Sequence, residues 1–423
     1  MNYRQFGKLD WKPSVLGFGS QRLPVKGMVR GGNKQPEAVR MIRYAIDHGV
    51  NYVDTAYNYL GGKSELLVGM ALEDGYREKV KLATKMPTWM VNSHQDMDKY
   101  FNEQLGRLRT SYVDFYLLHS LNQKRWDKLK RLDVIVWLER KVYEGKIKHF
   151  GFSFHDDFNV FKNIVDGYDG WAFCYVQYNY MDEDRQAGTQ GLEYAASKGL
   201  GVVVIQPIGG GNLVVNLPKG VQDLWDTAEV KRTPAEWALR WVWNHPQVSV
   251  VLSGMNTIEQ VIQNVKSASY SDFCGMTVKE LELVGRVKKK YGELNFVQCS
   301  GCGNCMPCPE GVNIPMILSF YNEYHMKEKA KNIRSKYWDD ISRKNQARRC
   351  VRCGKCEELC PQKFSLESII SEAALIFESG HREVSYYPRQ VIRFVKAKLR
   401  KIVNLVCQIW RRIRFRSEYR HKF

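Results

Sequence analysis

The sequence predicts an α/β protein whose first part is a (β/α)8 barrel, and three observations support this fold. Short apolar runs that read as strands alternate with amphipathic helical stretches from residue 15 to about residue 265. Eight such repeats with short connections are typical of a closed barrel of parallel strands. A doubly wound sheet, the rival fold, would carry a glycine fingerprint after its first strand, and residues 17–22 do not supply one.

The elements of the expected barrel follow one another in regular order. Residues 3–7 and 8–11 are expected to form a hairpin that closes the floor of the barrel. The expected strands are 16–19, 51–54, 80–84, 112–118, 147–152, 173–177, 201–206 and 248–252. The clearest helical stretches are 36–48, 95–107, 125–144 and 234–243, with further helices expected at 277–291 and 365–378.

Length and composition predict more than a barrel. The chain has 423 residues, and we expect a barrel at 1–292, a small cysteine-rich domain at 293–380 and a basic tail at 381–423. The first residues lack the apolar core of a signal peptide, and no uncharged apolar run approaches the ~18–20 residues of a spanning helix. Eleven cysteines without an export signal indicate metal ligation rather than disulfides, and hence the cytoplasm.

Four chemically active side chains stand where expected strands end. Asp54 and Tyr59 follow the second strand, Lys85 ends the third, and His119 ends the fourth. In barrels of this class the carboxyl ends of the strands carry the chemistry. The four residues offer a phenol that gives a proton, a Lys–Asp pair that lowers the pKa of that phenol, and an imidazole that orients a carbonyl group.

These segments resemble the aldo-keto reductases over roughly the first 270 residues. The family's Asp-Thr-Ala-x-x-Tyr segment is matched by Asp54, Thr55, Ala56 and Tyr59. Its Thr-x-Lys and Tyr-x-Asp-x-Tyr-x-x-His patterns are similar to the segments that end at Lys85 and His119, although Thr84 directly precedes Lys85. The resemblance implies a catalytic set of Asp54, Tyr59, Lys85 and His119 that acts on a small carbonyl substrate.

The resemblance also implies NAD(P)H as a cofactor. Ser153 and Gln177 match the residues that hold a nicotinamide carboxamide. Loops after the seventh and eighth strands are the common phosphate site of such barrels. They contain Gly209, Gly210, Ser253 and Gly254.

Three positions depart from the family pattern. Phe154 replaces an Asn, and Ile205 or Gln206 stands where a stacking Tyr is usual. The basic residues that meet a 2′-phosphate are missing, with Gln260 and Asn264 as the polar candidates. FMN is therefore kept as an alternative to NAD(P)H.

Two combs of cysteines follow the barrel. The first is Cys299, Cys302, Cys305 and Cys308, and the second is Cys350, Cys353, Cys356 and Cys360; each ends in Cys-Pro. Close spacing lets three thiolates from one loop wrap an iron–sulfur cluster. The alternative is two zinc sites, but zinc ligands usually come as two separated pairs.

The combs resemble the two-cluster bacterial ferredoxin module, which implies two [4Fe–4S] clusters with crossed ligation. One cluster would use Cys299, Cys302, Cys305 and Cys360, and the other Cys350, Cys353, Cys356 and Cys308. The first comb has two residues, not three, before its last cysteine.

Three functions of different class fit these features. The first is an oxidoreductase whose barrel reduces or oxidises a small carbonyl or alcohol while the clusters relay electrons, with a redox partner protein as a further expectation. The second is an electron-transfer protein whose barrel holds a flavin or serves as a docking platform. The third is a binding module with structural clusters. The complete set of catalytic residues favours the first function, because a scaffold does not need it.

The tail is the most basic part of the chain. Residues 381–423 hold 13 Lys and Arg against 2 Asp and Glu, which is more than half of the net charge of +19. Apolar residues recur there at helical spacing, at Val391, Val395, Leu399, Ile402, Val406, Ile409 and Ile413. Such a basic amphipathic helix predicts peripheral contact with the inner membrane face. Packing on the barrel or on a partner is the alternative, and no nucleic acid is expected.

Overall fold

The computed structural model describes residues 1–25, 36–270, 275–294, 297, 299, 301–326 and 331–379. The chain divides into two compact units, Met1–Ala373 and Ala374–Phe423, and the first holds both the barrel and the cysteine combs. The expected domain limits at 292 and 380 stay predictions. The predicted amphipathic helix of the tail lies outside the described residues.

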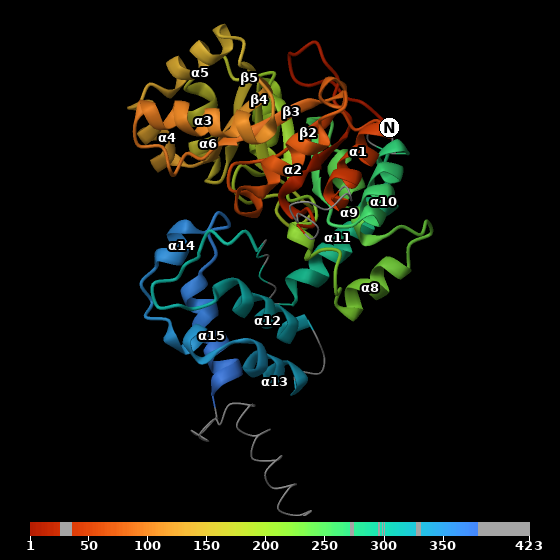
Figure 1. The fold of residues 1–423 in the computed structure, drawn as a ribbon. Coiled ribbons are helices and arrows are strands. Elements are labelled where there is room, and N and C mark those ends of the chain that lie inside the picture. Colours follow the sequence, from red (N-terminus) through yellow and green to blue (C-terminus); the bar gives the residue numbers. More distant parts are fainter. Residues whose placement is uncertain are drawn as a thin grey trace, which may run out of the picture. The chain divides into compact units, whose positions relative to one another are not determined.

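Eight parallel strands close into a barrel in chain order (Figure 1). They are β1 (Leu16–Gly19), β2 (Tyr52–Asp54), β3 (Lys81–Met86), β4 (Val113–Leu121), β5 (Ile147–Phe154), β6 (Phe173–Gln177), β7 (Gly201–Ile205) and β8 (Val248–Gly254). Strand β1 pairs in parallel with both β2 and β8, and this pairing closes the ring. The predicted fold class is confirmed, and each predicted strand is present.

Helices cover the outside of the barrel (Figure 1). They are α1 (Glu37–Asp47), α2 (Lys63–Ala71), α3 (His94–Leu108), α4 (Gln123–Lys130), α5 (Val134–Tyr143), α6 (Phe158–Asp166), α7 (Gly188–Ser197), α8 (Lys219–Asp226), α9 (Pro234–Trp243), α10 (Ile258–Ser269) and α11 (Val278–Gly292). The stretch expected as one helix at 125–144 is two helices. Asp133 takes a left-handed φ of 46° between α4 and α5, which breaks the helical path.

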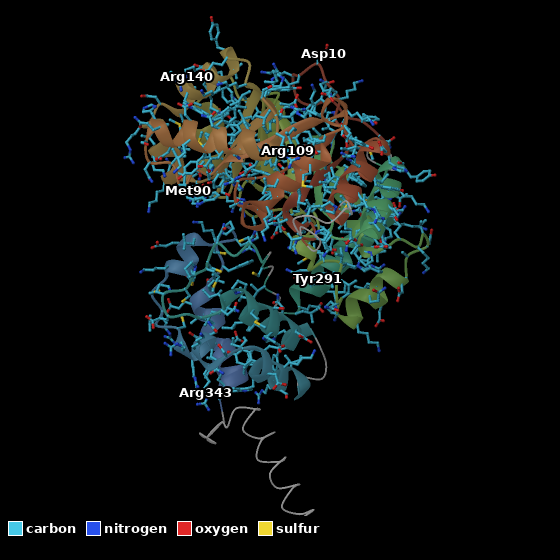
Figure 2. The ribbon with its side chains drawn as sticks, in the orientation of Figure 1. Asp10, Met90, Arg109, Arg140, Tyr291 and Arg343 are labelled. Atoms are coloured by element: carbon cyan, nitrogen blue, oxygen red, sulfur yellow. The ribbon has the colours of Figure 1, made fainter. Side chains whose placement is uncertain are left out.

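Apolar side chains fill both sides of the strands. Inside the barrel, Phe6 from the amino-terminal segment contacts Tyr52, Phe115 and Phe173 at ring distances of 6.0, 5.2 and 5.8 Å. Antiparallel bridges at Tyr3–Ser14 and Phe6–Leu9 hold this segment in the predicted hairpin at the floor. The outer helices carry charged residues such as Arg140 of α5, and Arg109 follows the end of α3 (Figure 2). With the floor filled, the open end of the barrel is the one at the carboxyl ends of the strands.

The cysteine combs lie between short helices of the first compact unit. These are α12 (Ile314–Met326), α13 (Lys331–Asp340), α14 (Lys355–Leu359) and the start of α15 (Leu366–Glu378). The Asn322 side chain of α12 accepts from the Val297 amide at 2.8 Å and donates to its carbonyl at 2.6 Å, which fixes the entry to the first comb. Among the described helices, none is both long and apolar enough to cross a membrane.

Candidate active site and cysteine module

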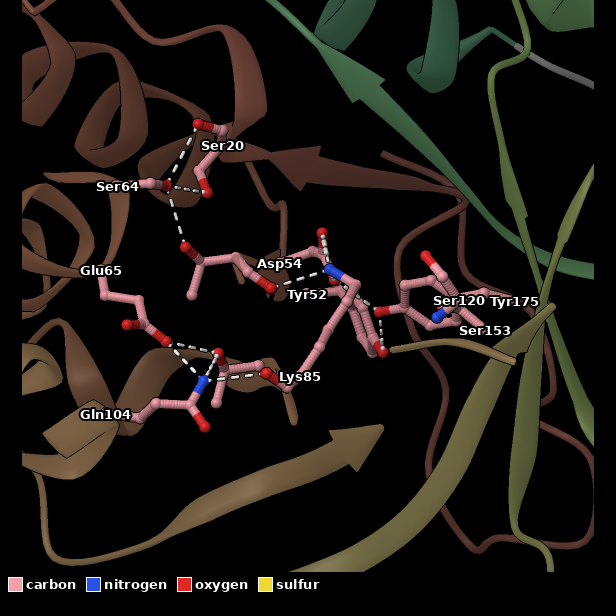
Figure 3. Close-up of polar contacts among 12 residues, drawn as sticks. Ser20, Tyr52, Asp54, Ser64, Glu65, Lys85, Gln104, Ser120, Ser153 and Tyr175 are labelled. Carbon is pink, nitrogen blue, oxygen red and sulfur yellow. Dashed lines mark hydrogen bonds and ion pairs between the residues drawn. The ribbon is translucent and has the colours of Figure 1, made fainter. Parts of the chain in front are cut away.

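Asp54 and Lys85 form a buried ion pair at the carboxyl ends of β2 and β3. Lys85 Nζ lies 2.6 and 2.7 Å from the two carboxylate oxygens of Asp54 and donates to the Thr55 carbonyl at 2.7 Å (Figure 3). Burial alone would lower the pKa of Lys85, but the charge and hydrogen bond of the Asp54 carboxylate raise it above its ordinary value. Lys85 is therefore a fixed ammonium group inside the barrel.

Tyr59 begins the short turn η2 (Tyr59–Gly62) that follows β2. The Lys85 ammonium lies 4.8 Å from the centre of its ring. Burial raises the pKa of Tyr59, and Lys85 opposes this without cancelling it. We expected the Lys–Asp pair to lower the pKa of this phenol. Lys85 does act in that direction, but the effect of burial is larger, so the pKa of Tyr59 is raised. Tyr59 is protonated at neutral pH, which is the form a proton donor needs.

His119 faces Tyr59 from β4. The two rings meet edge to face with centroids 5.9 Å apart, and Trp89 lies 5.2 Å from the other side of the imidazole. Burial, followed by the positive charges of Lys85 and Arg125 and by His155, lowers the pKa of His119 well below its usual range. Its Nδ1 has no hydrogen-bond partner among the described residues. His119 is thus a neutral imidazole that can bond a polar substrate atom.

Behind the ion pair lies a network of buried polar groups. Gln104 Nε2 donates to the Lys85 carbonyl at 3.0 Å, to Thr84 Oγ1 at 2.9 Å and to Glu65 Oε1 at 2.6 Å (Figure 3). Thr84 Oγ1 donates to the same Glu65 oxygen at 2.8 Å. These contacts hold the end of β3, and with it the position of Lys85.

A cavity of about 480 Å³ joins three of the four predicted catalytic positions, Tyr59, Lys85 and His119, to the cysteine module. Its barrel wall includes Tyr59, Lys85, Trp89, His119, Ser120, Arg125, Ser153, His155, Tyr175 and Gln177. Its other wall includes Cys302, Gly303, Asn304, Met306, Leu359, Pro361 and Gln362. Asp54 lies behind Lys85 and does not line this cavity. The first cysteine comb therefore reaches the place where the phenol and the imidazole meet.

The residues expected to hold a nicotinamide carboxamide lie in this cavity but already have partners. Ser153 Oγ accepts a hydrogen bond from the Ser120 amide at 2.6 Å. Gln177, the last residue of β6, bonds to Asp182 at 2.8 Å and to Gln362 of the cysteine module at 2.7 Å. The sequence alone did not indicate the contact with Gln362, since it joins positions 185 residues apart.

The expected phosphate loops line a second cavity of about 710 Å³. Gly209, Gly210 and Gly211 of the turn η4 (Gly209–Gly211) have φ values of 56°, 69° and 105°, a left-handed run that favours glycine. Ser253 and Gly254 end β8 beside this loop. The geometry leaves a groove of the kind in which backbone amides receive an anion.

Gln260 and Asn264, the polar candidates of α10, shape the same groove. Gln260 Oε1 accepts from the Asn256 amide at 2.9 Å, and Asn264 Nδ2 donates to Ser253 Oγ at 3.0 Å. Cys299 lines the cavity from the other side, and its carbonyl accepts from Asn212 at 2.7 Å. The side chains of Gln260 and Asn264 are thus both engaged in holding the loops that surround the groove.

The eight cysteines of the combs gather in two groups. Burial raises the pKa of Cys299, and the neighbouring thiols of Cys302 and Cys360 raise it further; Cys305, whose pKa rises to about 12, has the same neighbours. Cys308 and the first three cysteines of the second comb line another cavity, of about 80 Å³, together with Cys305. Each group unites thiols from both combs. Such a donor set of four thiols suits an iron–sulfur cluster.

The thiols of the two groups are not spaced around a single centre. Among the described residues, no three His, Cys, Asp or Glu side chains come close enough together to hold one metal ion. A zinc ion needs its four thiolates at about 2.3 Å from one centre.

Two side chains of the site, Tyr175 and Arg125, belong to no motif that the sequence shows. Tyr175 OH donates to Asp54 Oδ1 at 2.9 Å and lies 2.8 Å from Tyr52 OH (Figure 3). It stands two positions before Gln177 on β6, so the period of a strand could have placed it on the same face. Arg125 lines the active-site cavity from the first turn of α4, and no local pattern marked it.

A closed barrel with a buried Asp–Lys pair beside a phenol and an imidazole is the arrangement of a barrel oxidoreductase, and the comparison with known proteins agrees. Residues 15–282 match the aldo/keto reductase family, and residues 298–364 match a 4Fe-4S dicluster domain. The chain belongs to the aldo/keto reductase family, here fused to a two-cluster ferredoxin module. It is an oxidoreductase that combines a reductase barrel with iron–sulfur clusters.

Several relatives share the barrel. L-galactose dehydrogenase of Arabidopsis thaliana is 26% identical over 306 residues, which cover 66% of this chain and 93% of that protein. The uncharacterized oxidoreductase YrpG of Bacillus subtilis is 25% identical over 313 residues, 64% of this chain and 92% of its own.

Solved structures agree with this assignment. The holo form of the aldo-keto reductase AKR11C1 from Bacillus halodurans has a TM-score of 0.56 at 26% identity, over 68% of this chain and 96% of that one. An aldo-keto reductase from Klebsiella pneumoniae in complex with NADPH has a TM-score of 0.55 at 26% identity, over 67% and 93%.

Proposed function

We propose that the barrel interconverts a small carbonyl compound and its alcohol, and that the clusters exchange electrons with this reaction. One observation carries the proposal: Tyr59, His119 and the loop from Cys302 to Met306 line the same cavity of about 480 Å³. A reductase that worked independently of the clusters would not need their loop at its active site.

Tyr59 acts as the proton donor to the carbonyl oxygen in this proposal. The phenol is protonated at neutral pH, and the Lys85 ammonium, 4.8 Å from the ring, stabilises the phenolate that forms when the proton leaves. Asp54 holds Lys85 in place through two contacts of 2.6 and 2.7 Å. His119, neutral and next to Tyr59, orients the carbonyl oxygen by a hydrogen bond.

Two [4Fe–4S] clusters are proposed with crossed ligation. Cys299, Cys302, Cys305 and Cys360 would hold one cluster, and Cys308, Cys350, Cys353 and Cys356 the other. The grouping of the thiols in the fold supports this ligand set. When bound, such clusters supply electrons one at a time, and reduction of a carbonyl group takes two electrons and two protons.

A phosphate-bearing cofactor is proposed for the groove beside η4. The Klebsiella relative was solved with NADPH, which supports NAD(P)H as the first candidate. Gly209, Gly210, Ser253 and Gly254 would receive its phosphates, while Gln260 and Asn264 hold the loop. FMN, which can pass one or two electrons, stays the second candidate.

The cytoplasm is the proposed place of action, with a redox partner protein as donor or acceptor of electrons. The basic tail at 381–423 would bring the enzyme to anionic lipids on the inner membrane face. The cysteine usage and the charge of the tail support these points.

The test uses anaerobic protein with reduced clusters and a panel of small aldehydes and ketones. Tyr59→Phe should lower turnover about 10²–10⁴-fold, because it removes general acid catalysis, while iron content and folding stay those of the wild type. Tyr57→Phe is the matched control, because Tyr57 lies in the same loop but bonds to Glu103 outside the cavity. Undiminished turnover in the Tyr59 variant would remove Tyr59 as the proton donor. A wild type that turns over none of these carbonyl compounds would leave electron transfer, with the barrel as a docking platform, as the function.

A further inference from the structure

The side-chain amide of Gln177 has hydrogen-bond partners within the protein at both its nitrogen and its oxygen. Both of its N–H groups have acceptors, Asp182 Oδ2 at 2.8 Å and Gln362 Oε1 at 2.7 Å. Its carbonyl oxygen accepts from Gln362 Nε2 at 2.5 Å. Gln177 and Gln362 are 4% and 5% exposed, so this reciprocal pair of primary amides is shielded from water.

Three more contacts dock the segment that carries Gln362. Gln186 Nε2 donates to the Pro361 carbonyl at 2.7 Å, and Arg185 donates to the Gln362 carbonyl at 3.1 Å. The Arg185 guanidinium also lies 4.5 Å from the centre of the Phe364 ring. The segment follows Cys360 directly, so Gln362 and the predicted cluster ligand Cys360 belong to one short stretch of chain.

We propose that the Gln362 side chain occupies the position at which Gln177 would hold a nicotinamide carboxamide, so that the docked cysteine module excludes nicotinamide from the active-site cavity. A primary amide is the group that Gln177 would recognise in nicotinamide, and Gln362 presents the same group. A nicotinamide would have to break two short hydrogen bonds in a buried site, and leaving either amide unpaired there costs free energy. The inference rests on the proposed function only in placing the redox site in this cavity, and it counts against NAD(P)H, the first candidate named there, as the cofactor while the module is docked.

One neighbouring feature agrees with this exclusion. Ile205 and Gln206 line the cavity where a planar ring would need an aromatic platform. The residues present therefore do not fit a bound nicotinamide while the module is docked.

The test measures binding and not turnover, so its result is separate from that of Tyr59→Phe. Full-length anaerobic protein is titrated with NADPH and with NADH in a calorimeter. We expect a Kd weaker than about 1 mM for the wild type and at least about tenfold tighter binding for Gln362→Ala. Gln186→Ala is the matched control, since it removes a hydrogen bond from the same segment without freeing Gln177, and it should bind like the wild type.

Each other outcome overturns the proposal. Micromolar binding of NADPH to the wild type would show that Gln362 does not exclude the nicotinamide. If NADPH binds equally more tightly to Gln362→Ala and to Gln186→Ala, release of the segment that carries Gln362 would be the cause, and not removal of the Gln362 amide from the site. Unchanged weak binding in Gln362→Ala, with iron content retained, would remove Gln362 as the cause.

The charged residues in the wall of the active-site cavity support a second inference, which does not depend on Gln177 and Gln362. Of the residues that the structure describes, no Asp or Glu lines the active-site cavity, and Lys85 and Arg125 are the permanent cations in its wall. Asp54 neutralises Lys85 at 2.6 Å. Arg125 donates to the Ser120 carbonyl at 2.7 Å, and among the described residues no carboxylate pairs with it; burial lowers its pKa without opposition. An uncompensated guanidinium thus faces the cavity.

We infer that Arg125 binds an anionic group of the substrate, which makes the substrate a small carbonyl compound that bears a carboxylate or a similar anion. The Arg125 guanidinium lies 5.6 Å from the centre of the Trp89 ring, and the His119 ring lies 5.2 Å from the same Trp89 ring. The anion site is therefore next to the imidazole that orients the carbonyl oxygen. Charge-assisted bonds from a guanidinium to a carboxylate are about twice as strong as neutral ones, which suits recognition.

Pyruvate and its methyl ester test this inference, because they differ in charge and little in shape. We expect the wild type to bind pyruvate more tightly, and Arg125→Gln to lose at least about tenfold in affinity for pyruvate but not for the ester. Arg125→Lys should retain part of the preference, and Lys124→Gln, an exposed cation of the same helix, should retain all of it. An equal loss for both compounds in Arg125→Gln, or a wild type that prefers the ester, would overturn the inference.

Discussion

Tyr175 and Asp54 meet inside the barrel, from strands that are not neighbours in the ring. The phenol of Tyr175 donates at 2.9 Å to Oδ1 of Asp54, the oxygen that also receives Lys85 at 2.6 Å. Tyr52 OH lies 2.8 Å from the same phenol (Figure 3). The position of the catalytic ammonium therefore depends on β6 as well as on β2 and β3.

We expect Tyr175→Phe to weaken catalysis through Asp54. Loss of the bond should lower turnover about tenfold and the free energy of unfolding by about 1 kcal/mol. Tyr52→Phe removes a buried hydroxyl of the same cluster and should cost similar stability with little change in turnover. Steady-state kinetics and chemical denaturation of both variants check this. Equal turnover in the two variants would contradict a positioning role for Tyr175.

The clusters predict the metal content. Anaerobic protein should hold about eight irons per chain, whereas two zinc sites would give about two zincs and no iron. Cys302→Ala should lose about half of the iron, because one cluster loses a ligand. Cys174→Ala, a buried cysteine of β6 outside the combs, should keep all of it. Metal analysis with an absorption spectrum distinguishes these results, and full iron in Cys302→Ala would remove it from the ligand set.

His155 predicts a loss of stability in acid. Burial lowers the pKa of His155 to about 4 from its ordinary 6.5. Between these pH values the unfolded chain binds a proton that the folded chain does not, so the free energy of unfolding falls as pH falls from 6.5 to 4. The contribution is at most about 3 kcal/mol.

His155→Gln should flatten this dependence, and His48→Gln, at an exposed position after α1, should not. Unfolding by denaturant at several pH values between 7 and 4 measures both variants against the wild type. Parallel curves for His155→Gln and the wild type would show that His155 takes up a proton in the folded state.

The basic tail predicts binding to anionic lipid. Full-length protein should sediment with vesicles that contain phosphatidylserine, and a form that ends at Gly380 should not. Moderate salt should weaken the binding, because cations near headgroups are screened within about 10 Å. If both forms stay in the supernatant, the apolar stripe packs within the protein or on a partner.

The sequence by itself determined the barrel, the four catalytic positions and the cysteine combs. Each of these has a local signal. A strand shows as a short apolar run, Asp54, Lys85 and His119 stand where such runs end, and thiols that share a cluster repeat every third residue. Strand ends of a parallel barrel meet at one rim, so local positions were enough to bring these residues together.

Only the tertiary structure showed which contacts and charges surround the catalytic residues at the carboxyl ends of the strands. The bond between Gln177 and Gln362 joins residues 185 positions apart, and neither belongs to a motif that predicts the other. The raised pKa of Tyr59 is a balance in which burial exceeds the effect of Lys85, and burial depends on packing of the whole chain. The lone charge of Arg125 is likewise visible only when the surrounding wall is known, because an ion pair is defined by distance in space and not by distance along the sequence.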